Sequence, residues 1–236
     1  MIRTVPETGS TNADLLARLR SGEHLVEGEW LVADRQTRGR GRQGREWFDD
    51  SGNFMGSTVA RLLPGDPAPS TLTFVASLAL HETLRRFLPG TTSLKLKWPN
   101  DLLLENAKVS GILLEWEGQT VVVGVGVNLR SAPDVGERRV TAVSDHAPAP
   151  DRDRFAGEFA AQFATELDRW RSYGFEPIRS RWLAAAHPVG TALAVHDADG
   201  HKVTGSFAGL SQDGSLLLRT ADGATQTVHA GDLELA

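Results

Sequence analysis

Cysteine is absent from this chain of 236 residues. Its absence excludes disulfides, thiolate metal sites and thiol nucleophiles, and it fits a cytoplasmic protein. Long apolar runs are absent as well, since none approaches the ~20 residues of a membrane span. The N-terminal segment Met1–Glu7 also lacks the apolar core of a signal peptide. We therefore expect a cytoplasmic protein without a membrane segment.

Positive charge is scarce, because the chain has 25 Lys and Arg against 30 Asp and Glu and a net charge of −5. This balance argues against a nucleic-acid-binding surface as the main function. Apolar residues make up 40% and charged residues 23% of the chain, proportions typical of a globular protein. The length accommodates one large domain and one small domain with a substantial core.

One segment departs from this composition, because five arginines fall within eleven residues that contain no acid. They are Arg35, Arg38, Arg40, Arg42 and Arg45, with Gly39, Gly41 and Gly44 between them. Glycine permits backbone conformations that turn N–H groups inward. Backbone donors and guanidinium groups together suit an anion with several oxygens, such as a carboxylate or a phosphate. The alternative is a solvated basic loop without a ligand.

The three glycines also satisfy the dinucleotide-binding pattern Gly-x-Gly-x-x-Gly. That pattern requires a helix to begin at the glycines, so that its N-terminus can hold a pyrophosphate. The residues after Gly44 have no helical apolar period and are interrupted at Gly52. We therefore do not predict a Rossmann site in this segment.

Hydrophobic periodicity predicts a mixture of helices and strands in the first 186 residues. Helices are expected from Thr11 to near Gly22 and at 70–88, 151–170 and 177–186. Strands are expected at 30–33, 54–60, 108–116 and 120–129, and two further strands are expected to begin at residues 94 and 101. Short turns join the strands after residue 94, which predicts an antiparallel meander and not βαβ units. Glycines inside the last of these strands indicate a bulge or the close approach of a ligand or backbone.

The pattern changes after His187. Short apolar β segments follow, with Asp-Gly pairs at 199–200, 213–214 and 222–223. Such pairs favour hairpin turns, and their regular spacing is typical of a small β-barrel. We therefore predict two domains, residues 1–186 and 187–236, and we find no catalytic group in the second.

Several motifs occur together and in order along the chain. They are Gly9-Ser10-Thr11-Asn12, Gln36, the segment Gly39–Arg45 with Trp47, Lys97-Trp98-Pro99-Asn100-Asp101, Lys108 with Gly111-Ile112, and the segment Gly124–Asn128. With these motifs the sequence resembles the biotin protein ligase family over essentially its whole length. The arginine-glycine segment and the Lys-Trp-Pro-Asn-Asp motif are the most specific of them.

The resemblance implies an α+β fold. A catalytic domain with a mixed or antiparallel sheet, like that of class II aminoacyl-tRNA synthetases, would precede an SH3-like β-barrel. The implied reaction joins biotin and ATP, with Mg²⁺, into biotinyl-5′-AMP, and a lysine of a biotin carboxyl carrier domain then receives the biotin. Adenylation brings two anions together against Coulomb repulsion, a task that suits arginines and loop N–H groups.

The resemblance also implies roles for individual residues. The implied catalytic residues are Lys108, Arg42 and Asp101, and Asp101 is also the candidate Mg²⁺ ligand. The implied ATP or adenylate site comprises Arg42, Arg45, Trp47, Asn100, Lys108 and Asn128. The implied biotin site comprises Ser10, Thr11, Asn12, Gln36, Gly39, Arg40, Gly41, Arg42, Lys108, Gly111, Gly124 and Gly126.

Other interpretations stay open at this point. A lipoate ligase would share the fold, and a non-catalytic biotin-binding protein or a nucleic-acid-binding module would use the arginine segment differently. Many family members carry an N-terminal DNA-binding module, but the ligase motifs here begin at Gly9. We therefore expect no repressor role and no specific DNA partner. The expected partner is the carrier domain of a biotin-dependent carboxylase, and the chain is expected to be a monomer or a homodimer.

Overall fold

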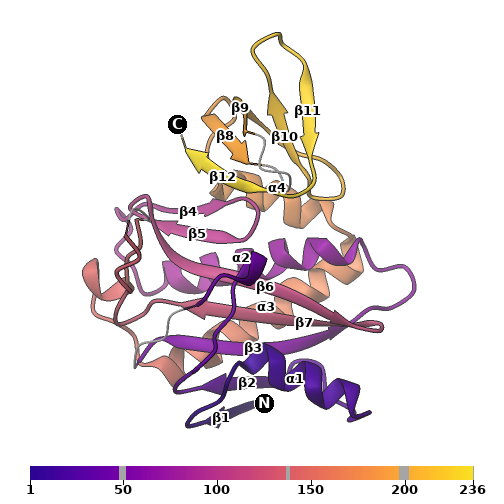
Figure 1. The fold of residues 1–236 in the computed structure, drawn as a ribbon, viewed down its shortest axis with the longest axis vertical. Helices are drawn as coiled ribbons and strands as arrows, with labels where there is room; N and C mark the ends of the chain where they lie inside the picture. Colours follow the sequence, from indigo (N-terminus) through magenta and orange to yellow (C-terminus); the bar gives the residue numbers. More distant parts are fainter. Residues whose placement is uncertain (48–51, 137–138, 197–201, 236) are drawn as a thin grey trace.

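The computed structural model describes residues 1–47, 52–136, 139–196 and 202–235. Its first sheet comprises β1 (Ile2–Val5), β2 (Trp30–Ala33), β3 (Phe54–Arg61), β4 (Leu94–Lys97), β5 (Asp101–Leu104), β6 (Ala107–Glu117) and β7 (Thr120–Val127). The spatial order of the strands is β1-β2-β3-β7-β6-β5-β4 (Figure 1). Strands β4 to β7 pair antiparallel in sequence order, which confirms the predicted meander.

Strand β1 was not predicted from the sequence. Its four residues are mostly exposed and show no apolar alternation, so they carry no local strand signal. The strand forms because it pairs in parallel with β2, from Ile2 beside Trp30 to Val5 beside Ala33. The sheet is therefore mixed, with the parallel pair at one edge.

Helices α2 (Leu72–Arg85) and α3 (Arg152–Tyr173) lie behind the sheet as it is viewed in Figure 1, and α4 (Glu176–Ala185) lies between this sheet and the C-terminal strands. On α3, Phe155, Phe159 and Phe163 are buried, as their spacing predicted. The Trp30 indole on β2 packs edge-on against Phe159 and Phe163, with ring centroids 5.0 and 5.5 Å apart. Within the described part of the chain, no helix combines the length and apolarity that a bilayer span requires.

Helix α1 (Thr11–Arg20) packs on the opposite face of the sheet. Its residues Leu15 and Leu16 join Leu31, Val59 and Val122 in a second, smaller core. The Ser10 side chain accepts a hydrogen bond from the backbone of the first turn, so it caps the helix. The packing of α1 on the sheet places its N-terminus beside the strands that carry the candidate site.

The C-terminal residues form a second, five-stranded antiparallel sheet with the order β11-β10-β9-β8-β12. It comprises β8 (Ala192–His196), β9 (Lys202–Leu210), β10 (Leu216–Arg219), β11 (Thr225–Val228) and β12 (Asp232–Leu235). Asp213-Gly214 and Asp222-Gly223 lie in turns between strands, as predicted, whereas Asp199-Gly200 lies outside the described residues. The fold is therefore α+β with two sheets, and the division at residue 186 and the closure of a barrel stay predictions.

The two sheets share one continuous core. The Trp98 indole Nε1, at the end of β4, donates a hydrogen bond to the carbonyl of Gly214 at 3.1 Å. Leu216 and Leu233 of the second sheet belong to the same buried cluster as residues of α2. This packing holds β12 next to the first sheet.

A buried carboxylate joins the helices behind the sheet. Glu166 of α3 is fully buried, and its Oε2 accepts hydrogen bonds from Arg169 at 2.5 Å and from Arg181 of α4 at 2.6 Å. Arg181 also pairs with Glu82 of α2 at 3.2 Å. Burial acts to raise the pKa of Glu166, but the hydrogen bonds from Arg181 and Arg169 outweigh burial and lower that pKa.

Replacing Glu166 with glutamine should lower the free energy of unfolding by about 2 kcal/mol at neutral pH, because Arg169 and Arg181 lose an ionic acceptor. The pKa is lower in the folded state, so this contribution is present above the ordinary carboxyl pKa. It is lost as the pH falls through the lowered value. Urea denaturation of wild type and variant across this pH range measures the difference.

The matched control for this prediction is Glu158→Gln on the same helix. Glu158 pairs with the exposed Arg154, so its loss should change stability by less than about 1 kcal/mol. A Glu166→Gln deficit that does not shrink in acid would contradict the assigned ionic role.

Candidate active site

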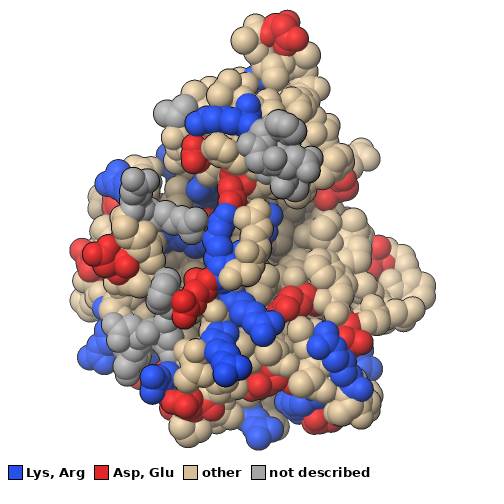
Figure 2. Space-filling model, viewed as in Figure 1, with Lys and Arg blue, Asp and Glu red and all other residues tan. Residues whose placement is uncertain are grey.

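A cavity of about 980 Å³ lies on the α1 face of the first sheet. Its walls come from the N-terminus of α1, the arginine-glycine loop, strands β3 and β5 to β7, and strand β12 of the second sheet. Figure 2 shows acidic and basic side chains side by side across the middle of the face below the C-terminal sheet. All the site residues predicted from the sequence line this cavity except Gly39.

The floor of the cavity is a row of glycines on β6 and β7. Gly111 and Gly126 lie opposite each other in the strand register, and the Trp47 indole packs on both. A Cβ at Gly126 would lie 2.5 Å from indole Cζ2, and one at Gly124 would lie 2.8 Å from Cγ of Asn12. The strand glycines therefore mark a close approach of other side chains, whereas the sequence predicted a bulge or the close approach of a ligand or backbone.

Polar side chains of α1 and β3 form one end of the cavity. Gln36 Oε1 accepts hydrogen bonds from the Thr11 backbone at 2.8 Å and from its hydroxyl at 3.1 Å. Ser57 Oγ lies 2.7 Å from Thr11 Oγ1 and donates to Asn12 Oδ1 at 2.6 Å. Ser57 was not predicted from the sequence, because a single serine in an apolar strand carries no motif.

The arginine-glycine loop folds back on itself. Gly41 N donates to Arg45 O at 2.7 Å, and Trp47 N donates to Gly39 O at 3.0 Å. Between them, Gln43 takes φ of 57°, a left-handed conformation that turns the chain. Gly39 lies under the backbone of Trp47, where a Cβ would be 2.5 Å from the Trp47 carbonyl oxygen. Gly39 therefore supports the loop from behind and does not face the cavity.

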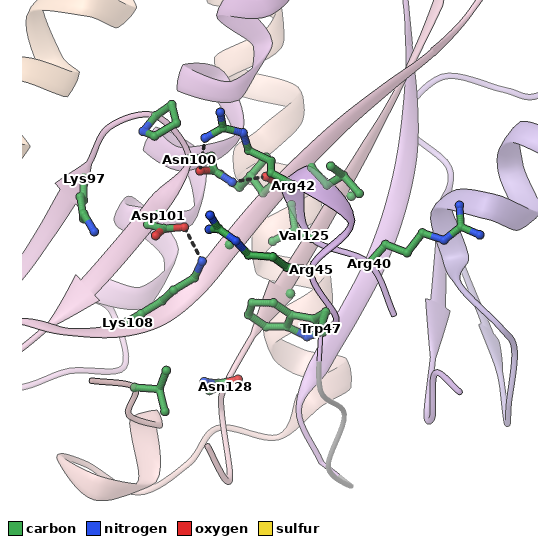
Figure 3. A pocket seen from close by; sticks show the side chains of 18 of the residues that line it. Arg40, Arg42, Arg45, Trp47, Lys97, Asn100, Asp101, Lys108, Val125 and Asn128 are labelled. Carbon is green, nitrogen blue, oxygen red and sulfur yellow. Dashed lines mark hydrogen bonds and ion pairs between the residues drawn. The ribbon is translucent and has the colours of Figure 1, made fainter. Parts of the chain in front are cut away.

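Cationic groups gather at the other end of the cavity, above β5 (Figure 3). Arg42 donates to Asn100 Oδ1 at 3.2 Å, and Asn100 donates in turn to the carbonyl of Ile112 at 2.7 Å. Burial lowers the pKa of the Arg42 guanidinium, and the negative charge of Asp101 opposes that shift. Arg42 is thus a partly desolvated cation whose side chain is held in place by a neutral amide.

Lys108 completes this group from β6. Its Nζ lies 2.6 Å from Asp101 Oδ1 and 5.9 Å from the centroid of the Trp47 ring. In Figure 3 Arg45 extends toward this pair and Arg42 toward Asn100, whereas Arg40 extends in the opposite direction. The Arg40 side chain is therefore separated from the Lys108–Asp101 pair, although both line the cavity.

The second sheet contributes acids to the cavity. Asp232 on β12 forms an ion pair with Arg45, with a second contact of 3.3 Å between Nη1 and Oδ1. Glu234, two residues further along β12, also lines the cavity. No functional group was predicted in this sheet, because Arg45, the partner of Asp232, lies near the other end of the chain.

Asn128 and Asp101 are the remaining predicted residues. Asn128 is buried and donates to the carbonyl of Thr141 at 3.1 Å. Among the described residues, no three His, Cys, Asp or Glu side chains are grouped so that they could hold a metal ion. Asp101 therefore offers a single carboxylate, which fits an ion such as Mg²⁺ that takes its other ligands from substrate phosphates and water.

Comparison with known proteins identifies the family. The model of the Biotin/lipoate A/B protein ligase family matches residues 6–128, and that of the Biotin protein ligase C terminal domain matches residues 193–235. A biotin--[acetyl-CoA-carboxylase] ligase of Paracoccus denitrificans is 40% identical over 96% of this chain and 97% of its own length. The chain belongs to the biotin protein ligase family. A relative of the same name from Mycobacterium tuberculosis is 34% identical over 97% of this chain and 86% of its own length.

A solved structure agrees with this assignment. A biotin protein ligase from Aquifex aeolicus in complex with biotin and ATP matches with a TM-score of 0.86 and 26% identity, over 100% of this chain and 99% of that chain. In this chain, the first matched segment contains every site residue predicted from the sequence, from Ser10 to Asn128. The second contains Asp232, the partner of Arg45.

Replacing Gly126 with alanine should displace the Trp47 indole, because the added Cβ would lie 2.5 to 2.7 Å from its atoms. Overpacking of this kind should also lower stability by about 1–3 kcal/mol. The indole N–H resonance of Trp47, assigned with a Trp47→Phe variant, should shift in nitrogen-edited NMR spectra. Gly157→Ala is the control, because a Cβ there meets no atom within 4 Å. An unshifted resonance in Gly126→Ala would contradict the packing described.

Proposed function

We propose that this protein is an ATP-dependent ligase that activates biotin as biotinyl-5′-AMP and transfers biotin to a lysine of a biotin carboxyl carrier domain. One observation carries the proposal: a single cavity joins the neutral wall of Thr11 and Ser57 to the cationic end at Arg42 and Lys108. A neutral ring with N–H groups suits the first end, and carboxylate and phosphate groups suit the second. The names of the matched ligases and the biotin and ATP in the matched complex support the same assignment.

Biotin is proposed to lie along the row of glycines. Its ureido ring would contact Ser10, Thr11 and Gln36, and its aliphatic chain would cross the floor toward Gly111. Its carboxylate would meet the loop N–H groups around Arg40–Arg42. Strands β3 and β5 are separated by β7 and β6 in the sheet, so these two ends lie roughly 14 Å apart at about 4.8 Å per strand spacing.

In the first step, a carboxylate oxygen of biotin attacks the α-phosphorus of ATP. The bond from that phosphorus to the β-phosphate oxygen breaks, and pyrophosphate leaves. Arg42, Arg45 and Lys108 are proposed to stabilise the negative charge on the phosphate oxygens, in a site already shaped for them. Arginine keeps its charge despite burial, because its ordinary pKa is far above neutral.

The rest of the nucleotide would contact Trp47, Asn100 and Asn128, with the adenine packing near the Trp47 indole. Mg²⁺ bound to ATP would supply further neutralisation of the phosphates. Such an ion commonly takes one or two protein carboxylates together with substrate phosphates, so Asp101 is the proposed protein ligand.

In the second step, the neutral amine of the carrier lysine attacks the acyl carbon of biotinyl-5′-AMP. The bond between that carbon and the phosphate oxygen breaks, AMP leaves, and the amine loses a proton. Asp101 is the proposed proton acceptor, because its carboxylate lies at the cationic end, 2.6 Å from Lys108. Lys108 would stay beside the acyl-phosphate oxygens and assist the departure of AMP.

The remaining parts of the proposal concern context. The partner is a carrier domain of a biotin-dependent carboxylase in the cytoplasm, and the chemistry requires neither DNA nor a membrane. The proposed state is a monomer or a homodimer, because residues of one chain line the cavity. The α+β architecture supports a catalytic fold like that of class II aminoacyl-tRNA synthetases, and the antiparallel second sheet supports an SH3-like barrel.

The deciding experiment mixes the protein with biotin, Mg-ATP and a purified carrier domain, and weighs the carrier by mass spectrometry. A gain of one biotinyl group, dependent on ATP, is expected. A carrier modified with lipoate and not with biotin would favour the lipoate ligase. Biotin binding without release of pyrophosphate would identify a non-catalytic binding protein.

Lys108→Ala should slow adenylate formation by about 10²–10³-fold, because the charge of Lys108 acts on oxygens that gain charge in the transition state. Pyrophosphate release measures the rate, and thermal unfolding checks that the variant is folded. Lys95→Ala is the matched control, since Lys95 lies on β4 of the same sheet and is not among the residues that line the cavity. Pyrophosphate release by Lys108→Ala at the wild-type rate would remove Lys108 from the mechanism.

The protein should not bind operator DNA in a sequence-selective way, because its net charge of −5 disfavours contact with phosphate backbones. Electrophoretic mobility of promoter fragments, with and without biotin and ATP, tests this expectation at several salt concentrations. A selective shift that biotin and ATP strengthen would show a repressor role.

A further inference from the structure

Thr11, Asn12 and Ser57 form the polar end of the cavity, here called the inner wall. We infer that Glu115, which does not line the cavity, sets the direction of hydrogen-bond donation in this inner wall. The wall thereby presents acceptors to the ligand, and it prefers a ring that carries N–H groups. The inference rests on the proposed function, because it explains how biotin would be distinguished from a ligand such as lipoate. Glu115 is a positioning residue that acts through Asn12.

A continuous chain of hydrogen bonds connects Glu115 to the cavity. Asn12 Nδ2 donates to Glu115 Oε2 at 2.9 Å and to the carbonyl of Leu113 at 3.5 Å. Ser57 Oγ donates to Asn12 Oδ1 at 2.6 Å, and Thr11 Oγ1 lies 2.7 Å from Ser57 Oγ. Thr11, Asn12 and Ser57 are each at most 3% exposed, so their partners come from the protein or from a ligand.

The direction of these bonds follows from the partners of Asn12. A carboxylate and a backbone carbonyl only accept hydrogen bonds, so the amide nitrogen of Asn12 must face Glu115 and Leu113. The amide oxygen then faces Ser57, whose single hydroxyl hydrogen is donated to it. Ser57 Oγ must therefore accept the hydrogen of Thr11, which Gln36 Oε1 shares at the longer distance of 3.1 Å. The donations from Thr11, Ser57 and Asn12 thus run in sequence toward Glu115.

The ligand consequently meets acceptors. Both hydroxyl hydrogens are used inside the wall, which leaves lone pairs of Thr11 and Ser57 available to the cavity that both residues line. The ureido ring of biotin offers N–H donors to them. The dithiolane ring of lipoate offers none and would leave buried acceptors unpaired, which is unfavourable. Asn12 cannot move closer to the sheet, because its amide already packs on Gly124.

Glu115→Met tests the inference, because it removes the acceptor and keeps the length of the side chain. Only the longer, 3.5 Å contact with the Leu113 carbonyl then holds the Asn12 amide, so the amide can turn over and the wall loses its fixed direction. We expect the Kd for biotin, measured by calorimetry without ATP, and the KM for biotin to rise about tenfold. We expect kcat and the KM for ATP to change by less than about twofold, since Glu115 touches no reacting group. The affinity for lipoate should not fall.

Two variants serve as controls. Glu115→Gln should restore biotin affinity to within about twofold of the wild type, because its amide oxygen accepts from Asn12. Glu117→Met removes another carboxylate of β6. Glu117 pairs with Arg20 of α1 at 2.7 Å, and not with Asn12 of that helix. This variant should leave the Kd for biotin unchanged. If Glu115→Met does not fold, Asn12→Ala interrupts the same series of hydrogen bonds and should lower the affinity for biotin but not that for lipoate.

The results separate this inference from the proposed function. An unchanged Kd for biotin in folded Glu115→Met, or equal losses of biotin and lipoate affinity, would overturn the inference even if the wild type transfers biotin. A wild type that binds biotin with the expected variant pattern, but transfers none to a carrier, would overturn the proposed function alone. A wild type that binds no biotin would overturn both.

Discussion

The close approach of side chains to the sheet at three glycines is the constraint on which the cavity depends. Trp47 packs on Gly111 and Gly126, and Asn12 packs on Gly124. Any larger residue at Gly124 or Gly126 would overlap these side chains, and the loop or the start of α1 would have to move. The two ends of the cavity are thus positioned against the same pair of strands, β6 and β7, which lie near the middle of the sheet. The relative position of the two ends of the cavity is therefore determined by β6 and β7.

Charge compensation allows a strongly basic site to exist in an acidic protein. Lys108 pairs with Asp101, and Arg45 pairs with Asp232, so the cations do not face one another without counter-charges. A phosphate or carboxylate ligand would replace one anionic partner with another. Such an exchange preserves charge-assisted hydrogen bonds and avoids leaving a partly buried cation unpaired. Arg42, held by a neutral amide, is the cation with the least compensation within this group.

The second sheet is part of the same structural unit as the site. Trp98 of the Lys-Trp-Pro-Asn-Asp motif donates to the carbonyl of Gly214, and the buried residues of both sheets form one cluster. Strand β12 is therefore held against the cavity, and Asp232 reaches Arg45. The motif thus has a structural function in addition to the one implied for Asn100 and Asp101, because it fixes the C-terminal sheet beside the loop.

The sequence by itself determined the local elements and most of the cavity wall. Aromatic residues such as Phe159 recur at the helical period, and Asp-Gly pairs mark turns, because both patterns depend only on neighbouring residues. The cluster of arginines and glycines identified the loop, and the glycines of the strand at 120–129 indicated either a bulge or the close approach of a ligand or backbone. The motifs from Ser10 to Asn128 identified the family, which the comparisons confirmed.

Tertiary structure alone decided the remaining features. Ser57 belongs to a buried strand and Asp232 to a terminal one, and neither has a neighbour in sequence that indicates a role. Strand β1 exists only because it pairs with β2, and the direction of the inner wall depends on Glu115 meeting Asn12 across more than a hundred residues of chain. Periodicity and composition report how a segment is buried. They do not report which distant side chain it meets, because that contact is set by the packing of whole elements.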